Sequence, residues 1–145
     1  MAYRIKLDQS KCVGCYACYV ACLDAHYQAE EEHAVSFRSI QKYIDKEDEF
    51  EKNICVGCVH CGQCMQVCPQ HAIYKDAETG LILVDQEVCT GCKLCETVCP
   101  LHVIRFDKNG KMTKCDGCIE RIREGRKPAC VKVCCPGAIV WEEKE

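Results

Sequence analysis

The most constraining feature of this chain is a run of four cysteines, CTGCKLCETVCP, at residues 89–100. With this C-x2-C-x2-C-x3-C-P spacing, three thiolates hold one [4Fe–4S] cluster and the fourth reaches a neighbouring cluster. Gly91 permits the unusual backbone that such a tight curl requires. Pro100 ends the short helix that we expect over Glu96–Cys99. A zinc site instead needs two separated cysteine pairs, so the run predicts iron–sulfur chemistry.

The cysteine content is the second strong constraint. The chain has 18 cysteines among 145 residues, a density that also occurs in secreted disulfide proteins. Its start, MAYRIKLD, lacks the apolar segment of a signal peptide, and no apolar run is long enough to insert in a membrane. We therefore expect a cytoplasmic protein of an anaerobe, in a reducing compartment where clustered cysteines bind metals. The net charge of −3 argues against nucleic acid as a partner.

A first cysteine run, CVGCYACYVAC, occupies residues 12–22 and has the same spacing without the proline. An alternating strand is expected before it, over Tyr3–Leu7. Helical composition from Tyr16 to Glu32 puts Cys18 and Cys22 one turn apart on one helix face. From spacing alone these two cysteines can serve one cluster or two different clusters.

The second run, CVGCVHCGQCMQVCP at residues 55–69, has one cysteine too many. Reading from Cys58 reproduces the C-x2-C-x2-C-x3-C-P spacing without an insertion and is preferred. Reading from Cys55 makes Cys61 the spare thiol, and this alternative stays open. His60 could replace a thiolate, as in Rieske centres, but with surplus cysteines we expect a non-ligand role. A strand over Val35–Ile44 and a charged loop over Asp45–Lys52 are expected before this run.

Two hairpins follow the second and third runs. One joins residues 72–75 to 81–84, and the other joins 103–106 to 111–113 through an Asn-Gly turn. Residues 53–108 therefore contain an internal repeat of cysteine run, proline and short strand. This repeat is typical of a two-cluster ferredoxin unit.

The fourth cysteine set, at residues 115–136, is looser: it reads C-x2-C-x11-C-x3-C, with Cys135 as an extra thiol. Taken alone, the two separated cysteine groups could hold zinc, but three iron–sulfur runs beside them favour iron. A helix is expected over Ile119–Glu124, stopped by Gly125. A strand over Ala138–Trp141 closes the chain, with Trp141 in the core.

The order of motifs resembles the four-cluster ferredoxin-type electron-transfer subunits of the dimethyl-sulfoxide-reductase, formate-dehydrogenase and hydrogenase group. The most specific piece is KCDGCIERIREGRKPACVKVC at 114–134, and the strand FRSI at 37–40 also fits. The resemblance implies an α+β fold, a pseudo-symmetric pair of bacterial ferredoxin-like modules with short β-hairpins and short helices. Residues 1–52 and 109–145 would be the two halves of an outer module, and 53–108 the inner module. The extra Cys135 and the absence of some longer segments depart from the family pattern.

The resemblance also implies four [4Fe–4S] clusters whose ligands are shared between runs in a nested order. The first three cysteines of each run bind one cluster, and the fourth belongs to the paired run. The implied ligand sets are Cys12, Cys15, Cys18 and Cys134; Cys115, Cys118, Cys130 and Cys22; Cys58, Cys61, Cys64 and Cys99; and Cys89, Cys92, Cys95 and Cys68. Cys55 and Cys135 are the alternative ligands.

These features predict an electron-transfer subunit that is not an enzyme by itself. It would relay electrons between a catalytic subunit, of molybdenum- or tungsten-pterin or hydrogenase type, and a further redox subunit or soluble ferredoxin, in a hetero-oligomer. The alternatives are a free soluble polyferredoxin and a zinc-stapled interaction module. Four cations are candidates for raising cluster potentials by favouring the reduced state: Lys93, Lys114, Lys132 and Arg121.

Overall fold

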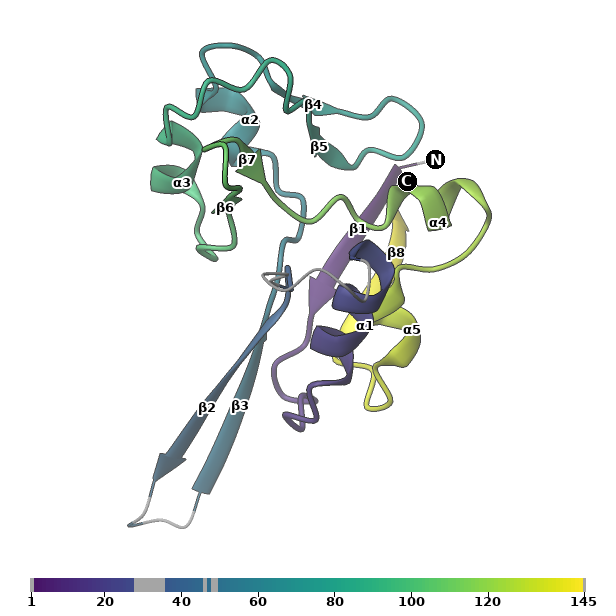
Figure 1. Cartoon of the computed structure of the whole chain (residues 1–145). Helices are drawn as coiled ribbons and strands as arrows, with labels where there is room; N and C mark the ends of the chain where they lie inside the picture. The colour runs from purple at the N-terminus through teal and green to yellow at the C-terminus, as the bar shows by residue number, and fades with distance from the viewer. Residues whose placement is uncertain (1, 28–35, 46, 48–49, 145) are drawn as a thin grey trace.

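The computed structural model describes residues 2–27, 36–45, 47 and 50–144. Short strands and short helices alternate along the chain (Figure 1), as the sequence predicts. The elements are β1 (Ala2–Leu7), α1 (Ala17–His26), β2 (Ser39–Asp45), β3 (Phe50–Val56), α2 (Gln63–Val67), β4 (Ile73–Lys75), β5 (Ile82–Val84), α3 (Leu94–Val98), β6 (Arg105–Phe106), β7 (Met112–Thr113), α4 (Ile119–Arg123), α5 (Ala129–Val133) and β8 (Ile139–Lys144).

The two ends of the chain fold together into one body. Strand β1 pairs antiparallel with β8, from Ala2 opposite Lys144 to Leu7 opposite Ile139. Helix α1 packs against α5, and cysteines of both helices lie in a core with aliphatic residues of both strands. Tyr3 stacks on the partly buried Trp141, with ring centroids 4.7 Å apart. Both predicted end strands are therefore confirmed, and β8 extends to Lys144 because β1 offers a partner along its whole length.

The middle of the chain forms a second body. Strands β4 and β5 form one antiparallel hairpin, and β6 and β7 form another, as the sequence predicts. Helices α2 and α3, which carry the third cysteines of the second and third runs, pack against each other. The core of this body mixes cysteine and aliphatic side chains: Cys64, Ala72, Ile73, Ile82, Cys89, Cys95, Ile104 and Met112.

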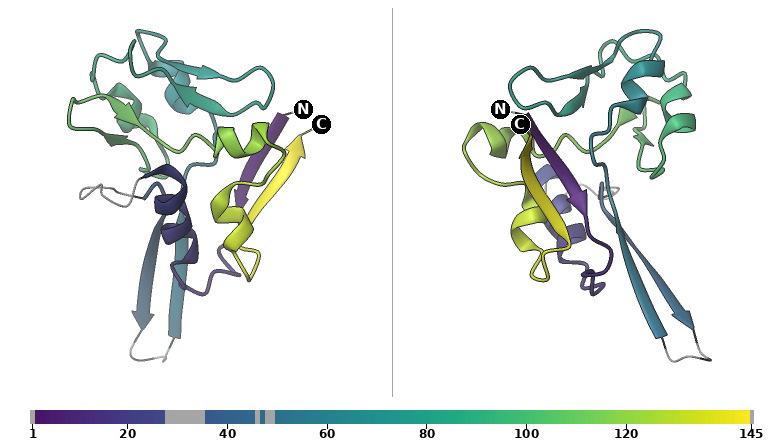
Figure 2. Two further views of the ribbon diagram at one scale, coloured as in Figure 1. Left: turned by 45° about the vertical axis from the view of Figure 1, so that its right-hand side comes forward. Right: turned by 180° about the vertical axis from the view of Figure 1, so that it is seen from behind.

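A long hairpin of β2 and β3 projects away from both bodies (Figure 2). It corrects the charged loop predicted over Asp45–Lys52, because β3 begins at Phe50 and pairs with β2 as far as Val56 opposite Ser39. Backbone pairing across the hairpin outweighs the loop-like composition. Cys55 consequently lies in a strand rather than in a cysteine loop.

Helix α1 is shorter than predicted and ends at His26, with Tyr27 in an extended conformation. The His26 side chain turns back to the Cys22 carbonyl and across to Asp116, and Tyr27 contacts the Phe37 ring, so tertiary contacts override the helical composition. The rest of the predicted helix, residues 28–32, lies outside the described residues. The predicted strand over Val35–Ile44 begins only at Ser39, and Val35 also lies outside the described residues.

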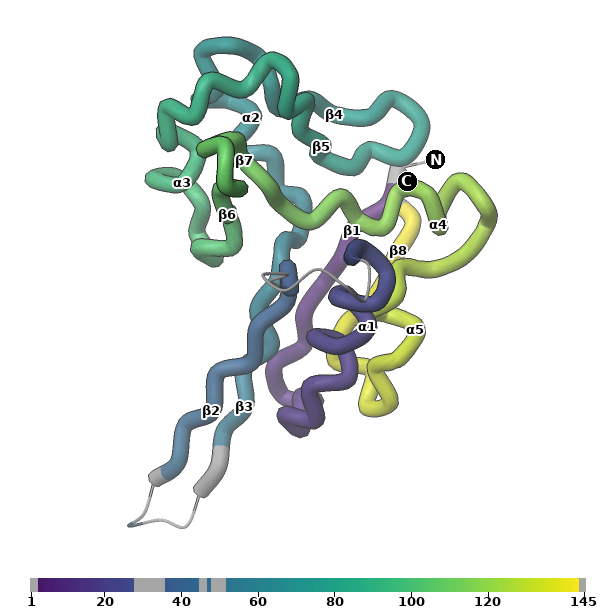
Figure 3. The backbone as a smooth tube through the Cα atoms, in the orientation of Figure 1, coloured from purple at the N-terminus to yellow at the C-terminus, as the bar shows by residue number. Residues whose placement is uncertain are grey.

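The two bodies touch through a small apolar cluster of Leu81, Leu83 and Ile119, against which Trp141 packs. The backbone N–H of Tyr3 also donates to the Thr79 carbonyl, 2.7 Å away, in the turn between β4 and β5. Figure 3 shows the chain entering the middle body from β3 and returning from β7 to α4. Among the helices in the described ranges, none has the length and apolar character needed to cross a membrane.

Candidate iron–sulfur sites

Two cavities in the middle body are lined by cysteines from two different runs. One is lined by Cys58, Cys61, Cys64 and Cys99. The other is lined by Cys68, Cys89, Cys92 and Cys95. In each cavity three cysteines come from one run and the fourth comes from the other run. These are the groupings that the family resemblance implies for the inner module.

A third cavity, in the body formed by the chain ends, is lined by Cys12, Cys15, Cys18 and Cys134. Cys55 lines the same cavity from β3, whereas Cys135 is exposed. Gln9 holds Cys55 in place: its Oε1 accepts the Cys55 N–H at 2.8 Å, and its Nε2 donates to the Cys55 carbonyl at 2.7 Å. The spare thiol of the second run therefore lies beside the first run, which its sequence position does not reveal.

Two of the remaining cysteines, Cys22 and Cys118, lie beside His26. Its ring nitrogens lie 3.8 Å from the Cys22 sulfur and 3.9 Å from the Cys118 sulfur. Burial and the neighbouring thiolates of Cys118 and Cys22 raise the pKa of Cys130 to about 11. Burial likewise raises the pKa of the Cys115 thiol, with a further contribution from Cys58. Cys22, Cys115, Cys118 and Cys130 are the fourth ligand set that the resemblance implies, and this set stays a prediction.

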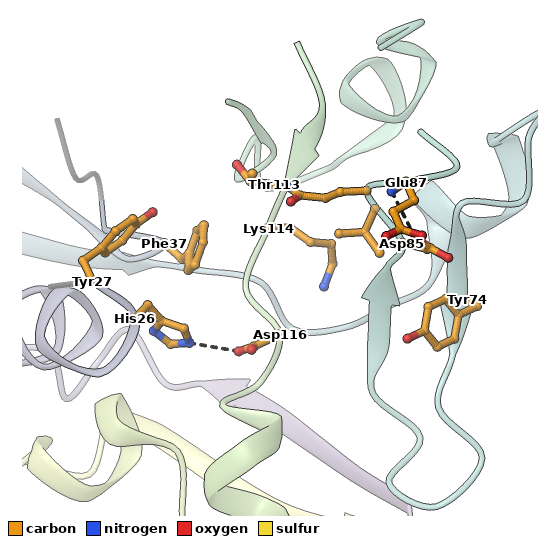
Figure 4. Close-up of a pocket in the computed structure, with 11 residues that line it drawn as sticks. His26, Tyr27, Phe37, Tyr74, Asp85, Glu87, Thr113, Lys114 and Asp116 are labelled. Atoms are coloured by element: carbon orange, nitrogen blue, oxygen red, sulfur yellow. Dashed lines mark hydrogen bonds and ion pairs between the residues drawn. The ribbon is translucent and has the colours of Figure 1, made fainter. Parts of the chain in front are cut away.

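His26 and Asp116 both line a cleft of about 560 Å³ between the two bodies (Figure 4). Its Nε2 lies 2.9 Å from Asp116 Oδ1, and its Nδ1 donates to the Cys22 carbonyl, also at 2.9 Å. Bonds to Asp116, Cys118 and Cys22 raise the pKa of His26 far above its usual range, so it is a cation beside two thiols. Because both ring nitrogens are engaged, His26 orients this group of cysteines.

The cysteine loops curl because the residue before the second cysteine of each run has a left-handed backbone conformation, with a positive φ. Gly14, Gly91 and Gly117 occupy this position with φ of 69°, 75° and 68°. His60 occupies it in the second run with φ of 57°, a conformation that an L-residue adopts less readily than glycine. The expected backbone role of Gly91 is therefore confirmed.

Backbone amides already point at several cysteine sulfurs. Four backbone N–H groups each donate to a cysteine sulfur at 3.3 Å: His60 to Cys58, Ala72 to Cys68, Met112 to Cys89, and Gly117 to Cys115. Such bonds favour the thiolate over the thiol, and in iron–sulfur proteins they raise the cluster potential.

His60 is 7% exposed and lines the Cys58 cavity. Its Nδ1 accepts the Ile82 N–H at 3.0 Å, and its Nε2 has no partner among the described residues. Burial, assisted by the nearby Lys114 cation, lowers the pKa of His60 to about 3, so the ring is neutral. With Nδ1 engaged by the backbone, the neutral ring carries its proton on Nε2. The non-ligand role of His60 stays a prediction, and this arrangement agrees with it.

Of the four cations that the sequence singles out, only Lys114 is buried. Its ammonium donates to the carbonyls of Ile82 and Cys115 and so joins the two bodies. The other three lie in more exposed positions: Lys93 is over the Phe106 ring, Arg121 donates to the Lys127 carbonyl, and Lys132 faces solvent.

Sequence reasoning missed a second buried cation, Arg38. Its side chain is almost wholly enclosed, and two of its nitrogens, Nε and Nη2, find no hydrogen-bond partner in the described part of the chain. The only signal in the sequence is a lone arginine in the FRSI segment.

The residues present fit [4Fe–4S] clusters. All 18 cysteines lie within the described ranges and are free thiols. Cysteines of two or more runs line each of three cavities, backbone amides point at several cysteine sulfurs, and buried donors of His60 and Arg38 lack acceptors among the described residues. A cluster would supply these donors with sulfur acceptors.

Comparison with known proteins decides the family. Models of the 4Fe-4S dicluster domain match residues 46–144 and residues 11–73. The chain belongs to the 4Fe–4S dicluster family. Two dicluster matches account for the four [4Fe–4S] clusters that the sequence predicts, and the resemblance to iron–sulfur subunits is confirmed.

This dicluster protein is similar in sequence to subunits of several oxidoreductases and to a protein of a hydrogenase operon. The B subunit of the anaerobic dimethyl sulfoxide reductase of Escherichia coli (strain K12) is 39% identical over 91% of this chain and 69% of its own length. The hydrogenase-2 operon protein HybA of Escherichia coli O157:H7 is 33% identical over 95% of this chain and 51% of its own length. The chlorate reductase subunit beta of Ideonella dechloratans is 41% identical over 58% of this chain and 26% of its own length.

Proposed function

We propose that this dicluster protein is the electron-transfer subunit of an anaerobic oxidoreductase complex. It relays electrons through four [4Fe–4S] clusters between a catalytic subunit and a second redox partner, and the chemistry on substrate belongs to the catalytic subunit. The observation that carries the proposal is the grouping of cysteines from distant runs around common cavities. Each cluster then has a full set of thiolates and no open position for substrate, as electron transfer requires.

We infer that the sixteen ligands follow the nested order. The three cysteine-lined cavities support it for the sets completed by Cys99, Cys68 and Cys134. The position of His26 between Cys22 and Cys118 supports it for the fourth set. Cys134 lines the first cavity and Cys135 does not, and Cys55 lies in β3; these observations support leaving Cys135 and Cys55 as non-ligands.

We also infer a pseudo-symmetric pair of ferredoxin-like modules. The pairing of β1 with β8 and the packing of α1 on α5 support an outer module assembled from residues 1–52 and 109–145. The two hairpins and the packing of α2 on α3 support an inner module over residues 53–108. The β2–β3 hairpin is an addition to this plan.

The contacts between cysteine groups suggest the order of the relay. Cys18 and Cys22 are one turn apart on α1, which makes the two outer clusters neighbours. Cys115 and Cys58 are close enough for their thiolates to repel, which links an outer cluster to the Cys58 cluster. The packing of α2 on α3 then leads to the Cys89 cluster. Short steps of this kind let electrons pass without diffusion of the protein.

The relatives are named as proteins of a dimethyl sulfoxide reductase, a chlorate reductase and a hydrogenase operon. These names support a catalytic partner that carries a molybdenum or tungsten pterin or is a hydrogenase. A hetero-oligomer follows, with a further redox subunit or a soluble ferredoxin as the other partner. The 18 free thiols favour a reducing compartment such as the cytoplasm.

The decisive experiment is to purify the protein from its own cells without oxygen, then measure iron, acid-labile sulfide and co-purifying subunits. About 16 iron and 16 sulfide per chain, with a molybdenum-, tungsten- or nickel-bearing companion, is the expected result. A fully loaded monomer with no companion would point to a free polyferredoxin. Zinc without sulfide would overturn the electron-transfer function.

A further inference from the structure

Arg38 lies where the segment 36–38 crosses helix α1. The Ser36 hydroxyl donates to the Tyr19 carbonyl at 3.1 Å and accepts the Arg38 N–H, also at 3.1 Å. The same segment also contacts the end of the helix, where the Phe37 ring lies edge-on to the His26 ring with ring centroids 5.5 Å apart. Because Tyr19 follows Cys18, this anchoring holds Arg38 beside the part of α1 that carries Cys18.

The Arg38 guanidinium is 3% exposed and lacks a conventional partner. Within the described residues its Nε and Nη2 have no acceptor, and it forms no ion pair with a carboxylate there. A buried cation without a counter-charge is strongly unfavourable. The site therefore requires negative charge from a source other than aspartate or glutamate.

Cysteine thiolates are the negative groups that face Arg38. Burial opposes its charge, but attraction to Cys130, Cys18 and Cys115 in the thiolate form that ligates a cluster raises the pKa of Arg38. Cys130 and Cys115 belong to one proposed outer cluster, and Cys18 belongs to the other. The cation thus lies near cysteines of both proposed outer clusters, each of which would carry about two negative charges with its thiolates.

The backbone beside the Cys58 run leaves room for this side chain. A Cβ on Gly57 would lie 2.6 Å from Cζ of Arg38, closer than atoms can approach. The absence of a side chain at Gly57, next to Cys58, therefore leaves room for the guanidinium. A planar fork with several N–H donors fits between two sulfur-rich groups better than a single ammonium.

We propose that Arg38 is a counter-cation shared by the two outer clusters, donating its unpartnered N–H groups to their sulfur atoms and raising both reduction potentials. The inference rests on the proposed function, since it needs the clusters. Reduction adds one negative charge to a cluster, and a buried cation stabilises that charge more than solvent does. Arg38 is a positioning residue, because it acts through the clusters. One substitution at Arg38 should therefore lower the reduction potentials of both outer clusters together.

The test is a redox titration of the fully loaded chain, followed by electron paramagnetic resonance, in Arg38→Gln and Arg38→Lys variants. Outer-cluster signals are those that disappear in Cys15→Ser and in Cys118→Ser variants. In Arg38→Gln we expect the reduction equilibrium of both outer clusters to become at least tenfold less favourable, about 59 mV for a one-electron couple. Arg38→Lys should retain most of the wild-type potential, and the Cys89 cluster should not change.

The matched control is Lys132→Gln, which removes an exposed positive charge from α5, close to Cys130. Its outer-cluster potentials should shift much less than those of Arg38→Gln. If Arg38→Gln fails to bind the outer clusters but Arg38→Lys binds them, the requirement for charge is supported. Unchanged potentials in Arg38→Gln, a shift of one outer cluster only, or equal shifts in the control would overturn the inference. The iron and sulfide content of the wild-type chain is measured in parallel. About 16 of each per chain would support the proposed function even where the inference about Arg38 is overturned.

Discussion

At the scale of single residues, Gly91 illustrates how closely the cluster loops are packed. Its φ is 75°, and a Cβ there would lie 2.5 Å from the Gly110 carbonyl oxygen. We expect Gly91→Ala to destabilise the protein for two reasons. The left-handed backbone costs alanine roughly 1–2 kcal/mol, and the clash with Gly110 adds a further cost. The Cys89 cluster should be lost first, and the rate at which its visible absorption bleaches in denaturant measures this.

Gly110 is the matched control for this substitution. It has the same φ of 75°, but a Cβ there would meet nothing within 4 Å. Gly110→Ala should therefore carry only the backbone strain and should bleach more slowly than Gly91→Ala. Equal bleaching rates in the two variants would show that the clash between a Cβ at position 91 and the Gly110 carbonyl does not affect the stability of the cluster.

At the scale of elements, the junction between the two bodies depends on the β4–β5 hairpin. Leu81 is 0% exposed and packs with Leu83 and Ile119, so it joins the hairpin to α4. Leu81→Ala should cost about 2–5 kcal/mol, because it removes buried methyl groups and leaves a cavity. Hydrogen exchange measured by mass spectrometry should accelerate in β4, β5 and α4 more than in the β1–β8 pair.

Leu94→Ala is the control for this truncation, because Leu94 is 47% exposed at the start of α3. It should leave the exchange pattern close to that of the wild type. An increase spread evenly over the whole chain in Leu81→Ala would instead mean that the two bodies unfold as one unit.

The sequence predicts those elements whose signals are local. Cysteine spacing marks the cluster loops, and the Asn109-Gly110 pair marks the β6–β7 turn, because each signal lies within a few residues. Strand β3 was missed because its charged residues resemble a loop and its stability comes from pairing with β2. The end of α1 was placed too late because His26 turns toward Asp116, a partner 90 positions away in the chain. Arg38 was missed for the same reason, since its surroundings exist only once α1 and α5 have come together.

At the scale of the whole molecule, the chain closes on itself. The pairing of β1 with β8 returns the last cysteine run to the first, so Cys134 reaches the cavity of Cys12, Cys15 and Cys18. Spacing alone left open whether Cys18 and Cys22 share a cluster, because the answer depends on this closure. Cys55 lines the same cavity from β3.

The nested ligand order makes a prediction that spans the chain. Cys22→Ser should remove the cluster of Cys115, Cys118 and Cys130, although Cys22 belongs to the first run, and should leave about 12 iron per chain. Its electron paramagnetic resonance spectrum should therefore match that of Cys118→Ser and differ from that of Cys15→Ser. A match to Cys15→Ser would instead mean that each outer run keeps its own four ligands.

The two spare thiols complete this prediction. Cys135 does not line the first cavity, and Cys55 lines it from β3 with its backbone bonded to Gln9; we expect that neither fills a ligand set. Cys135→Ser and Cys55→Ser should each retain about 16 iron, whereas Cys134→Ser should fall to about 12 by losing the cluster of the first run. Loss of iron in Cys135→Ser with none in Cys134→Ser would move that ligand by one residue. Loss in Cys55→Ser would mean that the first cavity recruits its ligand from the hairpin rather than from the end of the chain, and the closure by β1 and β8 would then serve the fold alone.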